Sequence, residues 1–441
     1  MLKTLRNAWK IPDLRRKILF TVLIIVIYRI GCAIPAPFVD VAALSAAFSG
    51  TQNSALSNFL MFSGGNFEKA TIFALGISPF INASIIMQLL TVAIPPLERL
   101  AKEGEAGRKK INQITKYVTI GIALLLGISY FLMIGNQFGS LVYTNAKTFS
   151  FWFAAVVIVL VFVAGASIVN WLGERVNENG IGNGISIILL AGIISRLPRA
   201  VINLGSTFIN SVQNLNDSLG QKMAIAIPIS ILIFAATIVF IVFITDAERR
   251  IPVQYAKRVV GRKVYGGQNS YIPIKVNMSG VMPAILATSI ISLPGVIFGF
   301  IGEPTGGFWK GFYDFFQPNH WFYTILFFVL IIAFAYFYVA MQYNPTEMAN
   351  DLRKNSGAIP GYRPGKPTSD YIARVLSKVT LIGALCLGII AVVPMIFGMV
   401  TNMPQLAMGG TSIMIVVGVA LETTQQLESQ MMMRHYKGFL Q

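Results

Sequence analysis

The sequence predicts a bundle of membrane-spanning α-helices. Hydrophobic residues make up 55% of the chain and charged residues only 12%, and the mean hydropathy is +0.66. Soluble domains carry about 25% charged residues. A helix needs about 20 mostly apolar residues to cross the hydrocarbon layer, and this chain offers a whole series of such stretches. Together these observations favour an all-α polytopic membrane protein.

Ten predicted spans follow one another along the chain. They cover residues 18–34, 72–94, 115–135, 152–172, 181–197, 222–245, 272–301, 320–342, 374–394 and 406–425. Cut into two sets of five, they predict an N-terminal half over 1–200, a C-terminal half over 201–425 and a tail over 426–441. The basic opening runs into the first span without a small-residue cleavage site, so we expect that span to be retained. An even number of spans places both termini on one side of the membrane.

Basic residues are concentrated on that same side. The formal net charge is +17, and 28 of the 35 Lys and Arg residues lie in the termini, in the loops after spans two, four, six and eight, or at the adjoining span ends. The positive-inside rule makes this side cytoplasmic. Membrane topology therefore accounts for most of the charge without a nucleic acid.

Two of the cytoplasmic loops are longer than topology requires. The loop 246–271 interleaves basic residues with β-branched and aromatic ones, which is typical of a hairpin. The loop 343–373 contains Pro345, Pro360, Pro364 and Pro367, which exclude a continuous helix. Long loops of this kind usually serve a partner. The alternative is a solvated basic surface that only orients the spans.

Spans two and seven differ from the others in polarity. Each carries prolines together with Asn, Ser, Thr or Gln side chains, and each is the second span of its half. Polar or irregular helices at membrane depth face other protein or a water-filled cavity. Interrupted spans at matching positions indicate a repeat with a functional path between the halves. The alternative is that small polar residues and proline kinks only pack helices together.

Several functional classes find no support in the sequence. No Asp, Glu, Lys or His lies near the middle of a predicted span, and Arg29 sits near the end of span one, where it can snorkel. His320 and His435 fall on opposite sides of the predicted membrane. Cys32 and Cys386 lie in or near apolar spans, as small hydrophobic residues do. We therefore expect no enzyme, no metal and no cofactor. An apolar path suits a gate that closes by dewetting.

The segment 55–70 precedes span two and is too short to cross the membrane. Its apolar part predicts a short helix that Gly64 and Gly65 would end. One interpretation is an amphipathic helix at the membrane interface. The other is a mobile stopper folded back into a funnel.

Seven strings resemble the SecY/Sec61 alpha family, in order along nearly the whole chain. They are MFSGG (61–65), ALGISPFINASIIMQLLTV (74–92), EGEAGRKKINQ (103–113), NENGIGNGISI (177–187), IPIKVNMSGVMPAI (272–285), SGAIPGYRPGKPT (356–368) and GGTSIMIVV (409–417). The resemblance implies a protein-conducting channel with a central pore between its two halves. Such a channel translocates unfolded secretory polypeptides and releases transmembrane segments laterally into lipid. It also implies the cell (plasma) membrane of a bacterium.

The resemblance assigns roles to individual residues. The pore ring falls on Ile77, Ile81, Ile185, Leu189, Ile285 and Ile415. The plug falls on Asn58, Phe59, Leu60, Met61, Phe62, Ser63, Gly64 and Gly65. The lateral gate lies between spans two and seven, at Asn82, Ser84, Gln88, Asn277, Thr288 and Ser289. For each ring residue the alternative is an ordinary role in helix packing.

The resemblance also implies partners. Small subunits of the kinds called SecE and SecG would bind the helices, and signal peptides and membrane lipid would meet at the gate. The SecA ATPase, or the ribosome with its nascent chain, would dock on the cytoplasmic loops. The docking residues would be Arg249, Arg250, Lys257, Arg258, Arg353, Lys354 and Arg363. Two rival classes remain, a secondary transporter for small solutes and a lipid scramblase.

Overall fold

The computed structural model describes residues 2–50, 65–136, 149–213, 218–255, 258–260, 263–265, 269–301, 306–317, 320–401 and 409–437. These residues form two compact units. Unit 1 comprises Met1–Ile227, Ile291–His320 and Val419–Gln441, and unit 2 comprises Pro228–Ile290 and Trp321–Gly418.

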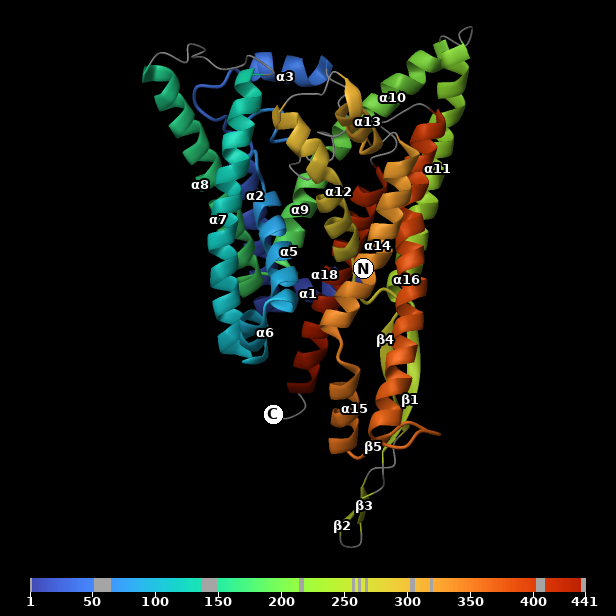
Figure 1. Ribbon diagram of the computed structural model, residues 1–441. Coiled ribbons are helices and arrows are strands. Elements are labelled where there is room, and N and C mark those ends of the chain that lie inside the picture. Colours follow the sequence, from blue (N-terminus) through green and yellow to red (C-terminus); the bar gives the residue numbers. More distant parts are fainter. Residues whose placement is uncertain are drawn as a thin grey trace. The chain divides into compact units, whose positions relative to one another are not determined.

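Unit 1 is built of helices. They are α1 (Leu2–Trp9), α2 (Pro12–Gly31), α3 (Val41–Gly50), α5 (Ser78–Ala93), α6 (Pro95–Lys102), α7 (Glu105–Asn136), α8 (Phe149–Asn179), α9 (Gly184–Ile194), α10 (Leu197–Gln213) and α13 (Gly307–Phe315). Helices α7 and α8 run side by side (Figure 1). Buried aromatic rings fill the core beside them: the Tyr130 ring lies 4.0 Å from that of Phe67 and 5.0 Å from that of Phe162, between ring centroids.

Three helices pass from one unit into the other along the chain. They are α11 (Ser218–Asp246), α12 (Met282–Ile301) and α18 (Gly409–Lys437). The helices of unit 2 alone are α14 (Trp321–Gln342), α15 (Pro345–Lys354) and α16 (Lys366–Thr401), of which α14 and α16 run side by side (Figure 1).

Unit 2 also contains the described strands. Strand β1 (Glu248–Tyr255) lies between β4 (Asn269–Lys275) and the short β5 (Gly357–Ala358), and both pairings are antiparallel. Strands β2 (Arg258–Val260) and β3 (Lys263–Tyr265) form a separate hairpin beyond the ends of β1 and β4 (Figure 1). The predicted hairpin in the loop 246–271 is confirmed.

The sheet, α15 and the first turns of α16 form a small folded body that we call the platform. Its buried core contains Ile251, Val253, Ile274, Ala349, Leu352, Ile359, Ile372, Leu376 and Val379. Inward-facing apolar residues alternate along β1 with exposed ones, as in a strand with one covered face. Pro345 opens α15, where its missing N–H costs no hydrogen bond.

Membrane-length helices dominate the described residues. Six helices are long and apolar enough to cross a membrane, and α5 with α6 makes a seventh candidate that bends by 104° at its break. A mostly helical polytopic membrane protein is therefore confirmed, while the count of ten spans stays a prediction.

The expected helical spans at 72–94 and 272–301 are wrong at their first residues. Residues 72–77 form turns, and α5 begins only at Ser78. Tyr271–Lys275 belong to β4, and α12 begins only at Met282. In the second case Ile272 and Ile274 alternate with polar or exposed residues. This is the period of a strand, and hydropathy summed over a window does not detect it.

Candidate functional site

Helix α5 is entered through a short non-helical segment in unit 1. Backbone hydrogen bonds hold this segment: Ile72 N–H donates to Ile34 O at 3.0 Å and Ala36 N–H to Ala70 O at 2.8 Å. Gly76 then adopts a φ of +53°, which L side chains rarely take, and α5 starts two residues later with Pro79 in its first turn. The segment is buried, as irregular backbone at membrane depth must be.

Helix α12 begins in the same way in unit 2. Its approach is the end of β4, where Val276 N–H donates to Ala247 O at 2.9 Å. Gly280 adopts a φ of +61°, and α12 starts two residues later with Pro283 in its first turn. Two helices that lie far apart in sequence therefore share one local design.

A glycine on a neighbouring long helix holds each entry segment. A Cβ added at Gly165 of α8 would lie 2.0 Å from Ile72 O, and a Cβ added at Gly383 of α16 would lie 2.2 Å from Val276 O. No real side chain tolerates such a distance to a backbone carbonyl. We call Gly165 and Gly383 the seat glycines, because only a residue without Cβ lets the entry segment approach this closely.

Sequence reasoning missed this design, although a signal was present. The strings GISPFI at 76–81 and GVMPAI at 280–285 have glycine, proline and isoleucine at the same spacing. The spacing pairs Ile77 with Val281 and Ile81 with Ile285. The seat glycines carry no comparable local signal, because their role depends on a carbonyl more than 90 residues away.

The predicted pore-ring residues lie on the first turns of their helices or within an apolar helix. In unit 1, Ile77 precedes α5 and Ile81 follows one turn later, while Ile185 and Leu189 stand one turn apart on α9. In unit 2, Ile285 lies in the first turn of α12 and Ile415 in α18. Four of the six are buried, while Ile81 and Ile185 are half-buried.

Within unit 2, α18 contacts the residue just before α12. A Cβ added at Gly418 of α18 would lie 3.1 Å from Val281 Cγ2. Ile415 and Ile285 each stand about one turn from this contact, so both belong to the same region of the unit.

The predicted gate residues use part of their hydrogen-bonding capacity within their own helices. Gln88 Nε2 lies 3.5 Å from Ser84 Oγ on α5. The Thr288 hydroxyl lies 3.0 Å from Ala284 O and 2.9 Å from Ile285 O on α12. Asn82 is half-buried and Ser289 is also half-buried. The buried Oδ1 of Asn277 accepts no hydrogen bond from the described residues.

Most of the predicted plug, Asn58 to Gly64, lies outside the described residues. Gly65, its last residue, has a φ of +87° and packs near the Arg196 guanidinium, which pairs with Glu68 at 2.6 Å. The next residue, Asn66, is buried and donates to Tyr28 Oη at 3.3 Å and to Cys32 Sγ at 3.0 Å. The described end of this segment is therefore firmly held in unit 1.

The platform presents basic side chains on a rigid frame. On β1, Arg250 pairs with Glu248 at 2.6 Å and lies over the Tyr271 ring, 4.7 Å from its centroid. The hydrogen bond to Glu248 raises the pKa of Arg250 above its ordinary value. Lys354 pairs with Asp351 at 3.6 Å. Lys257 lies outside the described residues, and Arg258 is described only as part of β2.

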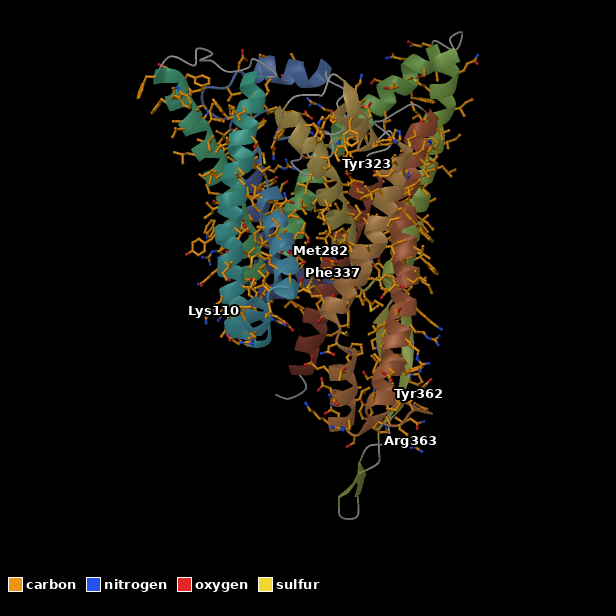
Figure 2. The ribbon with its side chains drawn as sticks, viewed as in Figure 1. Lys110, Met282, Tyr323, Phe337, Tyr362 and Arg363 are labelled. Carbon is orange, nitrogen blue, oxygen red and sulfur yellow. The ribbon has the colours of Figure 1, made fainter. Side chains whose placement is uncertain are left out.

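Arg363 stands at the tip of the platform together with Tyr362 (Figure 2). The Tyr362 ring packs on Tyr371 of α16, with centroids 4.2 Å apart, and Thr368 Oγ1 donates to Arg363 O at 2.8 Å. Gly361 and Gly365, with φ of +84° and +107°, turn the chain on either side. The loop backbone is therefore fixed while the guanidinium remains exposed.

Three of the predicted docking cations have no acidic partner within the described part of the chain. They are Arg249, Arg353 and Arg363, all of them exposed. Exposed cations on a fixed frame suit an anionic macromolecular surface, because no internal ion pair has to be broken first. The described residues contain no group of three or more His, Cys, Asp or Glu side chains that could hold a metal ion.

The fold and these sites define a polytopic helical membrane protein that carries a folded basic platform. Comparison with known proteins makes the class specific. The SecY family model matches residues 71–424. Curated proteins named protein translocase subunit SecY are 42% identical in Mycobacterium bovis and 44% identical in Streptomyces scabiei, over 100% of this chain and of each relative. The chain belongs to the SecY family.

Solved structures share the fold. A structure of a protein conducting channel matches with a TM-score of 0.60 at 19% identity, covering 94% of this chain and 92% of that one. Sec61 in the canine ribosome-channel complex from the endoplasmic reticulum matches with a TM-score of 0.57 at 18% identity and the same coverage. The predicted family is confirmed.

Proposed function

We propose that this chain is the pore subunit of a protein translocase in a bacterial cell membrane. It passes unfolded secretory polypeptides across the membrane and releases apolar segments sideways into lipid. The observation that carries this proposal is the full-length match to curated translocase subunits, at 42% identity over 100% of both chains. We propose that the chain hydrolyses nothing itself and that a SecA-type ATPase or the translating ribosome drives transport.

The proposed architecture has ten spans in two halves, residues 1–200 and 201–425, with both termini and the platform in the cytoplasm. The matched starts of α5 and α12 support it, because each is the second span of its half. The seat glycines support it as well, since α8 and α16 are the fourth spans of their halves. A structural repeat, with one copy in each half, accounts for both the matched helix starts and the matched seat glycines.

The proposed ring of Ile77, Ile81, Ile185, Leu189, Ile285 and Ile415 keeps the resting pore closed to ions. Branched aliphatic side chains offer water no hydrogen bond, so a narrow constriction made of them dries out. Stiff side chains also close around a passing chain of any sequence, because they do not require a particular partner. The plug over 58–65 would add a second barrier on the far side.

The proposed lateral gate separates α5 from α12. A signal sequence with an apolar core of about 7–15 residues gains free energy when it leaves water for lipid. The Ser84 and Thr288 hydroxyls already bond within their own helices, so separating α5 from α12 would not leave them without partners. Opening the gate therefore costs little free energy once a signal peptide lies between α5 and α12.

The gate can be tested with cysteines at Ser84 and Thr288 in a chain whose two native cysteines are replaced by alanine. A bifunctional cross-linker between them should block insertion of a signal sequence, while the same pair left unlinked should work normally. Full insertion activity in the linked protein contradicts this gate.

The platform is the proposed docking surface for the driving partner. Arg249, Arg353 and Arg363 are exposed and free of acidic partners within the described residues, and rRNA or an acidic protein surface would supply the missing anions. Binding to the ribosome should weaken as salt rises, because phosphate contacts release counterions. SecE- and SecG-type subunits are the proposed partners of the helices.

The function is tested by reconstitution of the chain with its small subunits into vesicles, with SecA, ATP and a secretory precursor. Arg363→Glu should slow precursor transport about tenfold or more, because truncating or reversing a contact of an interfacial charge pair costs about 2–5 kcal/mol. Arg199→Glu is the matched control: it makes the same charge change at an exposed position of α10. Equal transport by the two variants contradicts docking at Arg363.

The same vesicles separate the rival classes. A secondary transporter would move a small solute along an ion gradient without SecA, and a scramblase would exchange labelled lipid between the leaflets. A precursor that becomes protected from protease only when SecA and ATP are present favours the channel over both.

A further inference from the structure

Helix α13 is a short helix with a largely exposed aromatic face, in which the Phe315 ring lies 5.1 Å from that of His320, between ring centroids. Phe308, Trp309 and Phe315 are 79%, 61% and 48% exposed. Phe308, Phe312 and Phe315 recur at the i, i+4, i+7 spacing of one helix face, while Lys310, Gly311 and Asp314 lie on the other side. An aromatic face of this size is unfavourable in water and therefore favours an apolar partner.

Ring contacts with α12 fix the orientation of α13. The buried ring of Phe298, near the end of α12, lies 6.1 Å from Trp309, 6.2 Å from Phe312 and 5.5 Å from Tyr313, between centroids. Phe312 also contacts Phe316 at 4.9 Å. These contacts place α13 beside the end of α12 (Figure 1). The orientation of the exposed aromatic face is therefore fixed by the packing of α13 against α12.

Chain connectivity keeps α13 near the membrane boundary. Five residues separate Ile301 of α12 from Gly307, and five separate Phe315 from Trp321 of α14. A linker of this length reaches at most about 20 Å. Because α12 is an apolar helix and α14 has the length and hydropathy of a span, α13 lies where two membrane helices leave the apolar layer. It follows the end of α12 that is remote from β4, since α12 starts after β4.

We propose that α13 is an interfacial anchor whose aromatic face inserts into the phospholipid headgroup and acyl boundary at the end of α12 that is remote from β4. Trp and Phe are the residues of membrane-interface helices, and the indole N–H of Trp keeps a polar partner at that depth. Lys310 and Asp314 remain in water on the polar side. The anchor fixes the outer end of α12, which is the helix that the proposed gate has to move.

Depth-dependent fluorescence quenching tests this anchor. Trp309 is retained as the single tryptophan by changing Trp9, Trp152, Trp171 and Trp321 to Phe, and the chain is reconstituted with its small subunits in phosphatidylcholine–phosphatidylglycerol vesicles. Lipids with a nitroxide near the headgroup should reduce Trp309 emission about twofold or more, as expected for a face buried about 5–10 Å deep. A nitroxide at the acyl-chain end should quench less, and aqueous iodide should quench little.

Tyr362→Trp, placed in the tryptophan-free chain, is the matched control, because Tyr362 stands on the platform (Figure 2), which we propose to lie in the cytoplasm. It should be insensitive to both lipid labels. If the four replacements prevent folding, the difference in emission between the intact chain and Trp309→Phe gives the same quantity. Iodide quenching of Trp309 without lipid quenching would overturn the proposal in favour of a water-facing helix. Insensitivity to every quencher would overturn it in favour of a covering protein.

Discussion

The starts of α5 and α12 share one design but are attached to different parts of the molecule. Both have a glycine with positive φ two residues before the helix, a proline in the first turn and a seat glycine on a long neighbour. The approach to α5 is hydrogen-bonded to residues 34–36 of unit 1. The approach to α12 is the end of β4, which belongs to the platform sheet.

This difference assigns different mechanical roles to two similar helices. Force applied at the platform reaches α12 directly, because only residues 276–281 lie between β4 and the helix. The entry of α5 is instead hydrogen-bonded within unit 1, through Ile34 and Ala36. We therefore expect α12 to be the driven side of the proposed gate and α5 the fixed side.

The largest effect on folding is expected at the seat glycines. Gly165→Ala and Gly383→Ala should each destabilise the protein by about 1–3 kcal/mol, since the new methyl group would meet a backbone carbonyl that cannot move freely. The thermal unfolding midpoint in detergent measures the loss. The control is Gly121→Ala on α7, where an added Cβ meets nothing within 4 Å. Midpoints equal to that of the control would show that the seats do not constrain the entries.

A smaller loss is expected at the two turn glycines. Gly76→Ala and Gly280→Ala place a side chain at φ of +53° and +61°, which costs about 1–2 kcal/mol for an L residue. The two variants should lose similar stability in the same thermal assay, because the two starts share their geometry. A large loss at one and none at the other would break the comparison between the helices.

A still smaller loss is expected in the platform. Asn344 caps α15 by accepting a hydrogen bond from Thr346 N–H at 3.2 Å. Asn344→Ala should cost about 1 kcal/mol. Because the platform connects to α12, SecA-driven transport should slow while the ion leak of the resting channel stays unchanged. Raised leak in this variant would argue against separate roles for the platform and the pore.

The class of fold was predictable from the sequence, because apolar stretches of membrane length and the polarity of spans two and seven are local signals. The hairpin in 246–271 was predictable for the same reason. The helix starts were not: Ile272 and Ile274 are apolar enough to count as membrane residues, although their backbone pairs with β1. The seat glycines were not predictable either, because Gly165 and Ile72 are brought together only by folding.

Ile81 and Ile285 are the positions at which the shared design of α5 and α12 would act on the closed pore. Both stand five residues after the turn glycine of their helix, so the duplicated design places them at equivalent positions. If they line the constriction, an amide at either position admits water where the side chains otherwise leave the pore dry. Ile81→Asn and Ile285→Asn should then leave yield and unfolding midpoint close to those of the parent. Each should raise the ion conductance of the resting channel severalfold, and the double variant should raise it more.

If the residues only pack helices, the buried amide would instead lower stability by about 1–3 kcal/mol without a leak. Conductance in planar bilayers, measured beside the unfolding midpoint of the same preparation, separates the two outcomes. A folded double variant that conducts like the parent would remove both residues from the ring.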